Sequence, residues 1–360
     1  MEQFSCKTKI FSGPGSLEAL KELKIRRLLM VTDPYFHKNG TAQRIARLSG
    51  AEEISYFHKI VPDPSVELAA EGTALLRSFQ PDAVIALGGG SAMDCAKAMV
   101  YFAGLDIPLV AIPTTSGSGS EVTDFAILTH NGVKHPLVDS RVRPDYAILD
   151  SELLKELPPS LIADSGFDVL SHALEACVAK NASPITDALA KDAFTAVFSS
   201  LPASFAGDTS VRQKIHTAST MAGLAFTQAG LGLCHALSHS LGGQFHIPHG
   251  RLNAILLPAV ISCNAHMAGE KYAAVSRSAG LGGSVDTLAV RNLKNGLVRL
   301  RRELDLPETL AQAGIDPKEV RFRSKDIVEA ALADPCRATN PMNVEDFMVR
   351  RVLEEVTGRG

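Results

Sequence analysis

Apolar and polar positions along the first 155 residues follow two alternating patterns. Mostly apolar runs, with the length and β-branched content of strands, occupy residues 26–33, 51–60, 82–90 and 108–115. Helical spacing of apolar positions is found at residues 65–79 and 91–103, and a polar helical stretch follows the Asp33-Pro34 turn. Strands that alternate with helices in this way predict a parallel sheet covered by helices.

The pattern changes after residue 155. Long helical runs rich in Ala and Leu follow, with few β-branched stretches, and the Pro158–Pro159 pair marks the change. The sequence therefore predicts an α/β domain at residues 1–155 and an all-helical domain at residues 156–360. A chain of 360 residues is long enough to give each domain its own core.

Four of the chain's 11 histidines lie between residues 235 and 249. His235 and His239 are four positions apart, so they share one face of a helix. Upstream, Asp168 and His172 have the same spacing. Two such faces brought together would supply nitrogen and oxygen ligands for a divalent metal ion.

The alternative for any one of these histidines is a hydrogen-bonded core residue. Asp168 argues against that alternative for the cluster, because it lies in a run of Ala, Leu and Val, where an unpaired carboxylate would be costly to bury. A metal ion is its simplest partner. The HALSH segment at residues 235–239 has no Glu beside its first His, which excludes the HExxH pattern of zinc proteases.

Two loops at strand ends have the composition of a phosphate-binding site. GGGSAMD, at residues 88–94, places glycines before a helix whose free N–H groups can hold a pyrophosphate, and Ser91 and Asp94 form an S-x-x-D capping pattern. PTTSGSGSEVT, at residues 113–123, is a second loop of this kind. A tight turn without a ligand would explain the first loop alone, and it is not a GxGxxG fingerprint. Both loops together predict one dinucleotide site, because ligands bind at the carboxyl ends of parallel strands.

Composition narrows the class of protein. Hydrophobic residues make up 46% and charged residues 21%, as in ordinary globular enzymes. The net charge of -3 gives no indication of a nucleic-acid partner. No apolar run approaches the ~20 residues of a membrane span, and the N-terminus has no signal-peptide pattern. We therefore expect a cytoplasmic enzyme without nucleic-acid or membrane partners.

The DxxxH, GLxHxxxH and PHG motifs of this chain resemble those of iron-dependent (group III) alcohol dehydrogenases, and the similarity covers nearly the full length. This family has the dehydroquinate synthase-like fold, which glycerol dehydrogenase shares. The resemblance implies that Fe2+, or alternatively Zn2+, is bound by Asp168, His172, His235 and His249. It also implies that His239 is not a ligand but lies between metal and nicotinamide.

Within the family, residues 230–250 are most similar to the propanol dehydrogenases that serve 1,2-propanediol breakdown. This resemblance implies a homodimer and an association with a bacterial microcompartment.

The resemblance assigns both loops to NAD. The positions that match family contacts with the cofactor are Gly89, Gly90, Ser91, Asp94, Thr114, Thr115, Ser118 and Thr123. Lys134 matches a family lysine near the nicotinamide ribose, and Asp63 matches a position near the adenosine half; a turn is the alternative role for Asp63. Asp33 would bond the adenosine ribose and repel the 2′-phosphate of NADP, or it is only the turn residue before Pro34.

These features predict the interconversion of a small primary alcohol, such as propanol, and its aldehyde. The metal would polarise the oxygen, a hydride would pass between substrate and nicotinamide, and His239 would relay the proton. The alternative for His239 is a structural partner of a ligand. Phe226 is a candidate wall for an apolar substrate.

Other activities within this fold remain as alternatives. A dehydroquinate synthase-like or glycerol dehydrogenase-like enzyme is one, and a non-catalytic relative is another. A dehydroquinate synthase-like site needs cations for an anionic substrate, whereas Arg251 is the one cation beside the metal-binding motifs. Family members mostly have a small apolar residue at that position. A non-catalytic relative would need a broken motif, and every matched position is intact.

Overall fold

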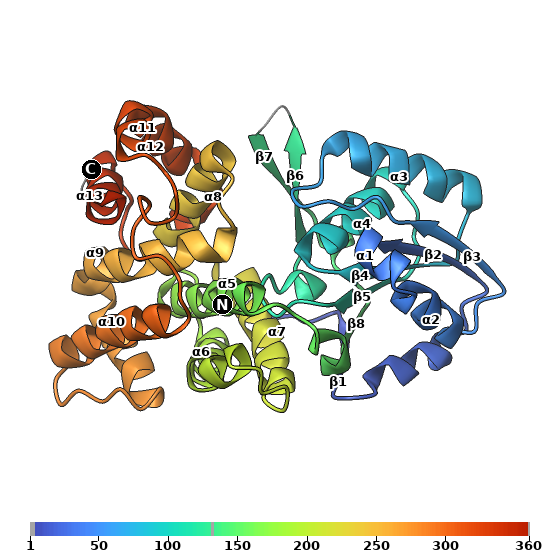
Figure 1. Cartoon of the computed structure of the whole chain (residues 1–360), viewed down its shortest axis with the longest axis horizontal. Coiled ribbons are helices and arrows are strands. Elements are labelled where there is room, and N and C mark those ends of the chain that lie inside the picture. Colours follow the sequence, from blue (N-terminus) through green and yellow to red (C-terminus); the bar gives the residue numbers. More distant parts are fainter. Residues whose placement is uncertain (1–3, 131–132, 359–360) are drawn as a thin grey trace. The chain divides into compact units, whose positions relative to one another are not determined.

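The computed structural model describes residues 4–130 and 133–358. The chain forms two compact units (Figure 1). Ser5–Leu157 form the first, which we call the sheet unit, and the chain from Pro158 onward forms the second, the helical unit. The predicted fold class, an α/β N-terminal part followed by an all-helical part, is confirmed.

Six parallel strands form the main sheet, in the order β1-β8-β5-β4-β2-β3. Their bounds are β1 Lys9–Ser12, β2 Arg27–Thr32, β3 Glu53–Phe57, β4 Ala83–Gly88, β5 Leu109–Pro113 and β8 Tyr146–Leu149. A separate antiparallel pair consists of β6 Phe125–His130 and β7 Val133–Val138. The four predicted strands correspond to β2, β3, β4 and β5. The central ones are continuous apolar runs because helices cover both faces of the sheet.

Alternate residues of each central strand feed two separate cores. Leu29, Val31 and Val84 pack beneath α3 Val66–Phe79 and α4 Gly90–Ala103. On the other face, Leu28, Met30 and Ile85 pack against the 3-10 helix η1 Ser16–Leu23 and against α2 Thr41–Leu48. Because the strands are parallel, their carboxyl ends, and the loops that follow them, lie at one edge of the sheet.

The remaining elements of the sheet unit are short. They are η1 Ser16–Leu23, α1 Pro34–Lys38, α2 Thr41–Leu48, η2 Ser120–Val122, η3 Ser140–Val142 and η4 Ser151–Leu154. The predicted cap of α4 by Ser91 is wrong. The helix begins two residues earlier than that pattern requires, with Gly89 as its N-cap and no side-chain cap, and the Asp94 carboxylate bonds other groups.

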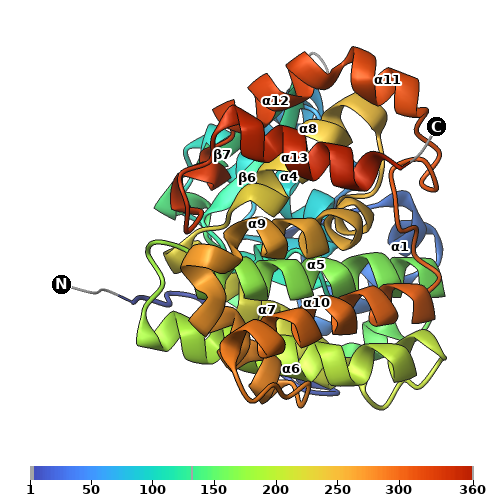
Figure 2. The ribbon, with the colours of Figure 1, turned by 90° about the vertical axis from the view of Figure 1, so that its left-hand side faces the viewer.

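The helical unit is built around α5 Pro159–Val178 and α9 His249–Ser278. Figure 2 shows α5 between α9 and the pair α6–α7, and α5 packs against all three. The other elements are α6 Pro184–Phe205, α7 Arg212–Ala229, α8 Leu233–Phe245, α10 Asp286–Glu303, α11 Pro317–Phe322, α12 Ser324–Ala333, η5 Pro335–Thr339 and α13 Asp346–Thr357.

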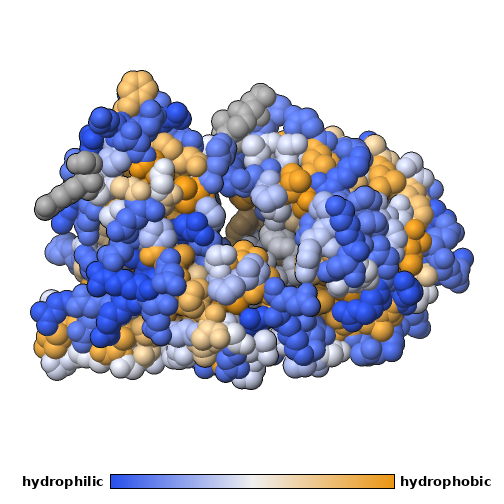
Figure 3. Space-filling view, in the orientation of Figure 1, coloured by the Kyte–Doolittle hydropathy of each residue, from blue (hydrophilic) through white to orange (hydrophobic). Residues whose placement is uncertain are grey.

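Helix α9 is long and apolar enough to cross a membrane by length and composition alone. Its apolar window is 67% buried inside the fold, and it contains the fully buried Asn253 and Asn264. Burial among neighbouring helices accounts for this apolar composition. On the face shown in Figure 3, hydrophobic residues are scattered among hydrophilic ones in both units.

Candidate metal centre and cofactor loops

Helix α5 presents Asp168 and His172 from one of its faces. The helix is apolar nearly all round, so both side chains are largely buried, at 12% and 6% exposure. His172 stacks on the Phe226 ring of α7, with centroids 4.4 Å apart and planes 25° apart. Phe226 is itself buried, so it backs the His172 imidazole in addition to any role it has toward a substrate.

Three imidazoles converge on one oxygen of Asp168. The Oδ1 atom lies 3.9 Å from Nε2 of His172, 3.8 Å from Nε2 of His235 and 3.5 Å from Nε2 of His249. His235 is the third residue of α8, in its first turn, and His249 is the first residue of α9. The sequence-predicted ligands, which are 81 positions apart at their extremes, are thus assembled within one unit.

The donor set fits a divalent ion. Two ligand atoms that are each about 2.1 Å from the same ion lie at most about 4.2 Å apart. The three distances from Asp168 Oδ1 meet that limit, and ligand atoms of Asp168, His172 and His235 all lie within 4.8 Å of one another. Burial raises the pKa of Asp168, so the carboxylate needs a cation beside it to stay ionised. Burial lowers the pKa of His235 well below its usual value, which keeps that imidazole in the neutral form that binds metals.

Glu175 holds His235 in place. Its Oε2 atom lies 2.6 Å from Nδ1 of His235, and the same carboxylate accepts hydrogen bonds from the backbone N–H groups of Gly232, Cys234 and His235. When Glu175 is ionised, Nδ1 of His235 donates to it, which leaves Nε2 free to face Asp168. Burial raises the pKa of Glu175 to about 7, although the backbone donors oppose that shift.

Two asparagines complete the support. Asn253, one turn after His249 on α9, donates from Nδ2 to Asp168 Oδ1 at 2.8 Å. Asn340 accepts the Leu233 N–H at 3.2 Å and so satisfies the remaining free donor at the start of α8. Side chains from distant segments therefore perform the capping that the sequence Gly232-Leu233 cannot provide for itself.

The start of α9 lies directly against α5. A Cβ at Gly250 would lie 1.9 Å from the Asp164 carbonyl oxygen, so only glycine fits after His249. Arg251 binds the Asp164 carboxylate through two contacts, Nε–Oδ1 at 3.1 Å and Nη2–Oδ2 at 2.9 Å. The unusual arginine is thus an anchor that holds His249 beside α5.

His239 bonds Asp334, whereas the three candidate ligand histidines lie around Asp168 Oδ1. Its Nδ1 lies 2.8 Å from Asp334 Oδ2, and its ring stacks on His249 with centroids 5.1 Å apart. Burial raises the pKa of Asp334, but hydrogen bonds from His239 and from the Cys336 backbone outweigh it and lower the pKa overall. An ionised Asp334 fixes the proton on Nδ1, which leaves Nε2 of His239 as its exchanging atom.

In the sheet unit, the two predicted loops meet. A Cβ at Gly89 would contact Thr115 Oγ1 at 3.3 Å, and one at Gly90 would contact Ser118 Oγ at 3.2 Å. The backbone N–H of Thr114 bonds the Gly88 carbonyl at 2.9 Å. Glycines are needed here because the second loop covers the first turn of α4 so closely.

Asp33 lies beside this pair of loops. Its Oδ1 accepts the Phe36 N–H at 3.0 Å as the N-cap of α1, and its Oδ2 lies 3.8 Å from the Cβ position of Gly88. Asp33 therefore does cap the turn that begins α1, as the alternative role predicted. It uses one oxygen only, so the carboxylate keeps a second oxygen at the strand ends of β2 and β4.

Four other predicted cofactor residues have side chains engaged inside the unit. Asp94 accepts from Ser120 Oγ at 2.8 Å and from the Ile127 N–H at 3.1 Å. Thr123 is fully buried and accepts from Lys97. Lys134 pairs with Asp63 at 2.7 Å, and Asp63 has a left-handed φ of 54°. These side chains shape the loops, and Ser91 remains part of the first turn of α4.

Comparison with known proteins identifies the family. The family model described as Fe-containing alcohol dehydrogenase family, C-terminal, matches residues 162–357, and the one described as iron-containing alcohol dehydrogenase matches residues 7–151. The chain is 42% identical to the 1-propanol dehydrogenase PduQ of Citrobacter freundii, over 99% of this chain and 100% of that one. The chain belongs to the iron-containing alcohol dehydrogenase family.

Two further relatives are informative about the cofactor. The chain is 36% identical to an NADPH-dependent butanol dehydrogenase of Clostridium saccharobutylicum, over 98% of this chain and 97% of that one. The structure of a sulfoacetaldehyde reductase from Bifidobacterium kashiwanohense in complex with NAD+ has a TM-score of 0.90 and 27% identity, and the match covers 100% of both chains.

The prediction of an alcohol dehydrogenase that interconverts an alcohol and its aldehyde is confirmed by the family. The family description agrees with the prediction of iron, whereas the coenzyme differs between relatives: the sulfoacetaldehyde reductase binds NAD+ and the butanol dehydrogenase is NADPH-dependent. The alternatives of a dehydroquinate synthase-like lyase and of a non-catalytic relative are not favoured.

Sequence reasoning missed the residues that support the metal centre of this alcohol dehydrogenase. Glu175 follows Asp168 by seven positions and His172 by three, which is one helical face, so a local signal existed. Asn253 likewise follows His249 by four positions. Asp334 is 95 positions from His239 and has no local signal.

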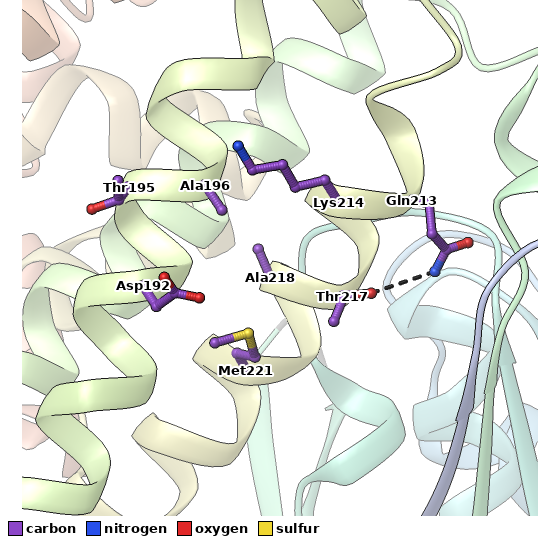
Figure 4. A pocket seen from close by; sticks show the side chains of 8 residues that line it. All are labelled: Asp192, Thr195, Ala196, Gln213, Lys214, Thr217, Ala218 and Met221. Carbon is purple, nitrogen blue, oxygen red and sulfur yellow. Dashed lines mark hydrogen bonds between the residues drawn. The ribbon is translucent and has the colours of Figure 1, made fainter.

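A cavity of about 360 Å³ on α6 and α7 does not involve the candidate ligands. Figure 4 shows Asp192 and Thr195 on one helix facing Lys214, Thr217 and Met221 on the other, with a contact between Gln213 and Thr217. This cavity is lined by residues of α6 and α7 and by none of the candidate metal ligands.

Proposed function

We propose that this protein reduces small uncharged aldehydes to primary alcohols, and the reverse, at a single divalent ion held by Asp168, His172, His235 and His249. The convergence of three Nε2 atoms on Asp168 Oδ1, at 3.5–3.9 Å, is the observation that carries the proposal. When bound, the ion would supply Lewis-acid polarisation of the substrate oxygen, and the coenzyme would donate the hydride as NADH in aldehyde reduction or accept it as NAD+ in alcohol oxidation.

The chain's own residues then orient the metal ligands and exchange the proton. Glu175 and Asn253 keep His235 and Asp168 in one geometry, so the ligand set is preorganised. His239 exchanges a proton at Nε2, taking it from water for the substrate oxygen in aldehyde reduction and returning it to water in alcohol oxidation, because Asp334 fixes the other nitrogen as a donor.

The electrostatics favour an uncharged substrate. Arg251 is the cation closest in sequence to His249, and its guanidinium is engaged by Asp164. It is therefore not available to bind a carboxylate or phosphate of a substrate. The similarity to a propanol and a butanol dehydrogenase supports an unbranched short-chain substrate.

The coenzyme is NAD in this proposal, on the strength of the free oxygen of Asp33. Gly89, Gly90, Ser91, Thr114, Thr115 and Ser118 form the surface for its phosphates, with Asp94 and Thr123 behind them. Lys134 and Asp63 extend that surface as an ion pair. The butanol dehydrogenase relative is NADPH-dependent, so this choice needs its own test.

We further propose, from the resemblance of residues 230–250 to propanol dehydrogenases of 1,2-propanediol breakdown, that the protein is a cytoplasmic homodimer associated with a bacterial microcompartment. Light scattering of the purified protein tests the dimer, and copurification with microcompartment shells tests the association.

A panel of aldehydes and alcohols, assayed with NADH and NADPH after anaerobic iron loading, tests the activity. We expect the highest kcat/KM for propanal-sized aldehydes and a sharp loss for carboxylated or phosphorylated analogues of equal length. Preference for an anionic substrate would contradict the proposal.

A further inference from the structure

Lys97, on α4, is fully buried, which is rare for a lysine. Its Nζ donates to Ser120 Oγ at 2.8 Å, to Thr123 Oγ1 at 3.0 Å and to the Phe125 carbonyl oxygen at 2.9 Å. All three donor positions of the ammonium are therefore used. The acceptors belong to the second loop and to the start of β6, whereas Lys97 belongs to the helix that follows the glycine turn.

The Lys97 contacts connect to those of Asp94, one turn earlier on α4. Asp94 accepts from the same Ser120 hydroxyl and from the Ile127 N–H of β6. A lysine and a carboxylate on one helix thus hold the loop at residues 118–125 from the inside. Ser118 of the same loop lies against Gly90, at the start of α4, where a Cβ would meet its Oγ at 3.2 Å.

We infer that Lys97 is a positioning residue for NAD, which fixes the second loop on the glycine turn without touching the cofactor. This inference rests on the proposed cofactor site. It reassigns Thr123, whose hydroxyl serves Lys97 and not the ligand. Without the Lys97 ammonium, the loop would no longer be held in the one conformation that accepts a dinucleotide.

If Lys97 positions the loop for NAD, the affinity for NADH should depend on the charge of Lys97, which a purely structural role would not predict. Burial lowers the pKa of Lys97 to about 8, against the opposing effect of Asp94, Glu121 and Asp124; Arg143 also lowers it. Above that pH the neutral amine has two donors for three acceptors, so NADH affinity falls. The free energy of unfolding changes in the opposite direction. Between about pH 8 and the unfolded pKa of 10.5, the unfolded chain binds the Lys97 proton and the folded chain does not. The contribution of Lys97 to the free energy of unfolding therefore rises with pH in this range.

The test compares NADH dissociation constants of the iron-loaded wild type, Lys97→Met, Thr123→Val and the double variant, by NADH fluorescence. The chain contains no tryptophan, so the protein contributes little background. We expect roughly tenfold weaker binding for Lys97→Met, and a smaller loss for Thr123→Val that adds nothing in the double variant. Metal content should stay at the wild-type level. The fall in affinity between pH 7 and 9 should be present in wild type and absent in Lys97→Met.

Thr73→Val is the matched control, because it removes another buried hydrogen bond of the sheet unit, from Thr73 Oγ1 to the Ala69 carbonyl. Equal losses in Lys97→Met and Thr73→Val would overturn the inference in favour of general destabilisation. Unchanged binding in Lys97→Met, or additive losses in the double variant, would also overturn it while leaving the cofactor site intact. Failure of the wild type to bind NADH would overturn both.

Discussion

Glu175 Oε2 lies 2.6 Å from Nδ1 of His235, and both side chains are almost completely buried. The same carboxylate accepts three backbone N–H groups at the start of α8. One side chain therefore fixes both the helix that carries the imidazole and the tautomer of the imidazole itself. Ligand orientation in this protein depends on the buried carboxylate of α5 as well as on the ligands.

Replacing Glu175 with Gln should weaken metal binding by about 10- to 100-fold. The amide has the size of the carboxylate, but its NH2 group would face N–H donors and could not accept from them. Competition with a chelator measures the affinity. Glu329→Gln, at an exposed position of the same unit, is the control. Equal metal affinity in the Glu175 variant and the control would show that the contact is dispensable.

His239→Ala should keep its metal and lose about 10²-fold in kcat, because the proton relay is removed while the ligands remain. Asp334→Asn should lose less, because the imidazole stays but its tautomer is no longer fixed. Metal analysis alongside steady-state kinetics distinguishes the roles. Loss of metal in His239→Ala would make His239 a ligand.

Asp33→Gly should raise kcat/KM for NADPH relative to NADH, since the charge that repels the 2′-phosphate is removed. The variant also loses the cap of α1, which costs about 1 kcal/mol. Asp33→Asn is the useful companion, because it keeps a capping oxygen without the charge. A wild type that prefers NADPH, or an unchanged ratio in both variants, would leave Asp33 as a capping residue only.

The local patterns pointed to a metal-binding cluster through the pairs Asp168/His172 and His235/His239, but the choice of His249 in place of His239 as the fourth predicted ligand came from the family resemblance. The support for these ligands was less visible. Asp334 and Asn340 reach α8 from far along the chain, so only the packed structure shows them. The same holds for the sheet, where short β1 and β8 have too few residues for a clear period.

Tertiary contacts also corrected two local interpretations. Ser91 and Asp94 have the spacing of a cap, yet Asp94 bonds Ser120 and the β6 backbone, because the second loop folds over α4. Thr123 matched a cofactor position in sequence and is buried behind the loop that it belongs to.

The central claim is that Asp168 and three histidines hold one divalent ion. The most direct measurement is the metal content of wild type and Asp168→Asn by mass spectrometry, after anaerobic iron loading and removal of free metal. Asn keeps the size of the side chain and removes the charge. We predict about one ion per chain in the wild type and almost none in Asp168→Asn, with NADH binding by the sheet unit retained. A fully loaded Asp168→Asn variant would contradict the account.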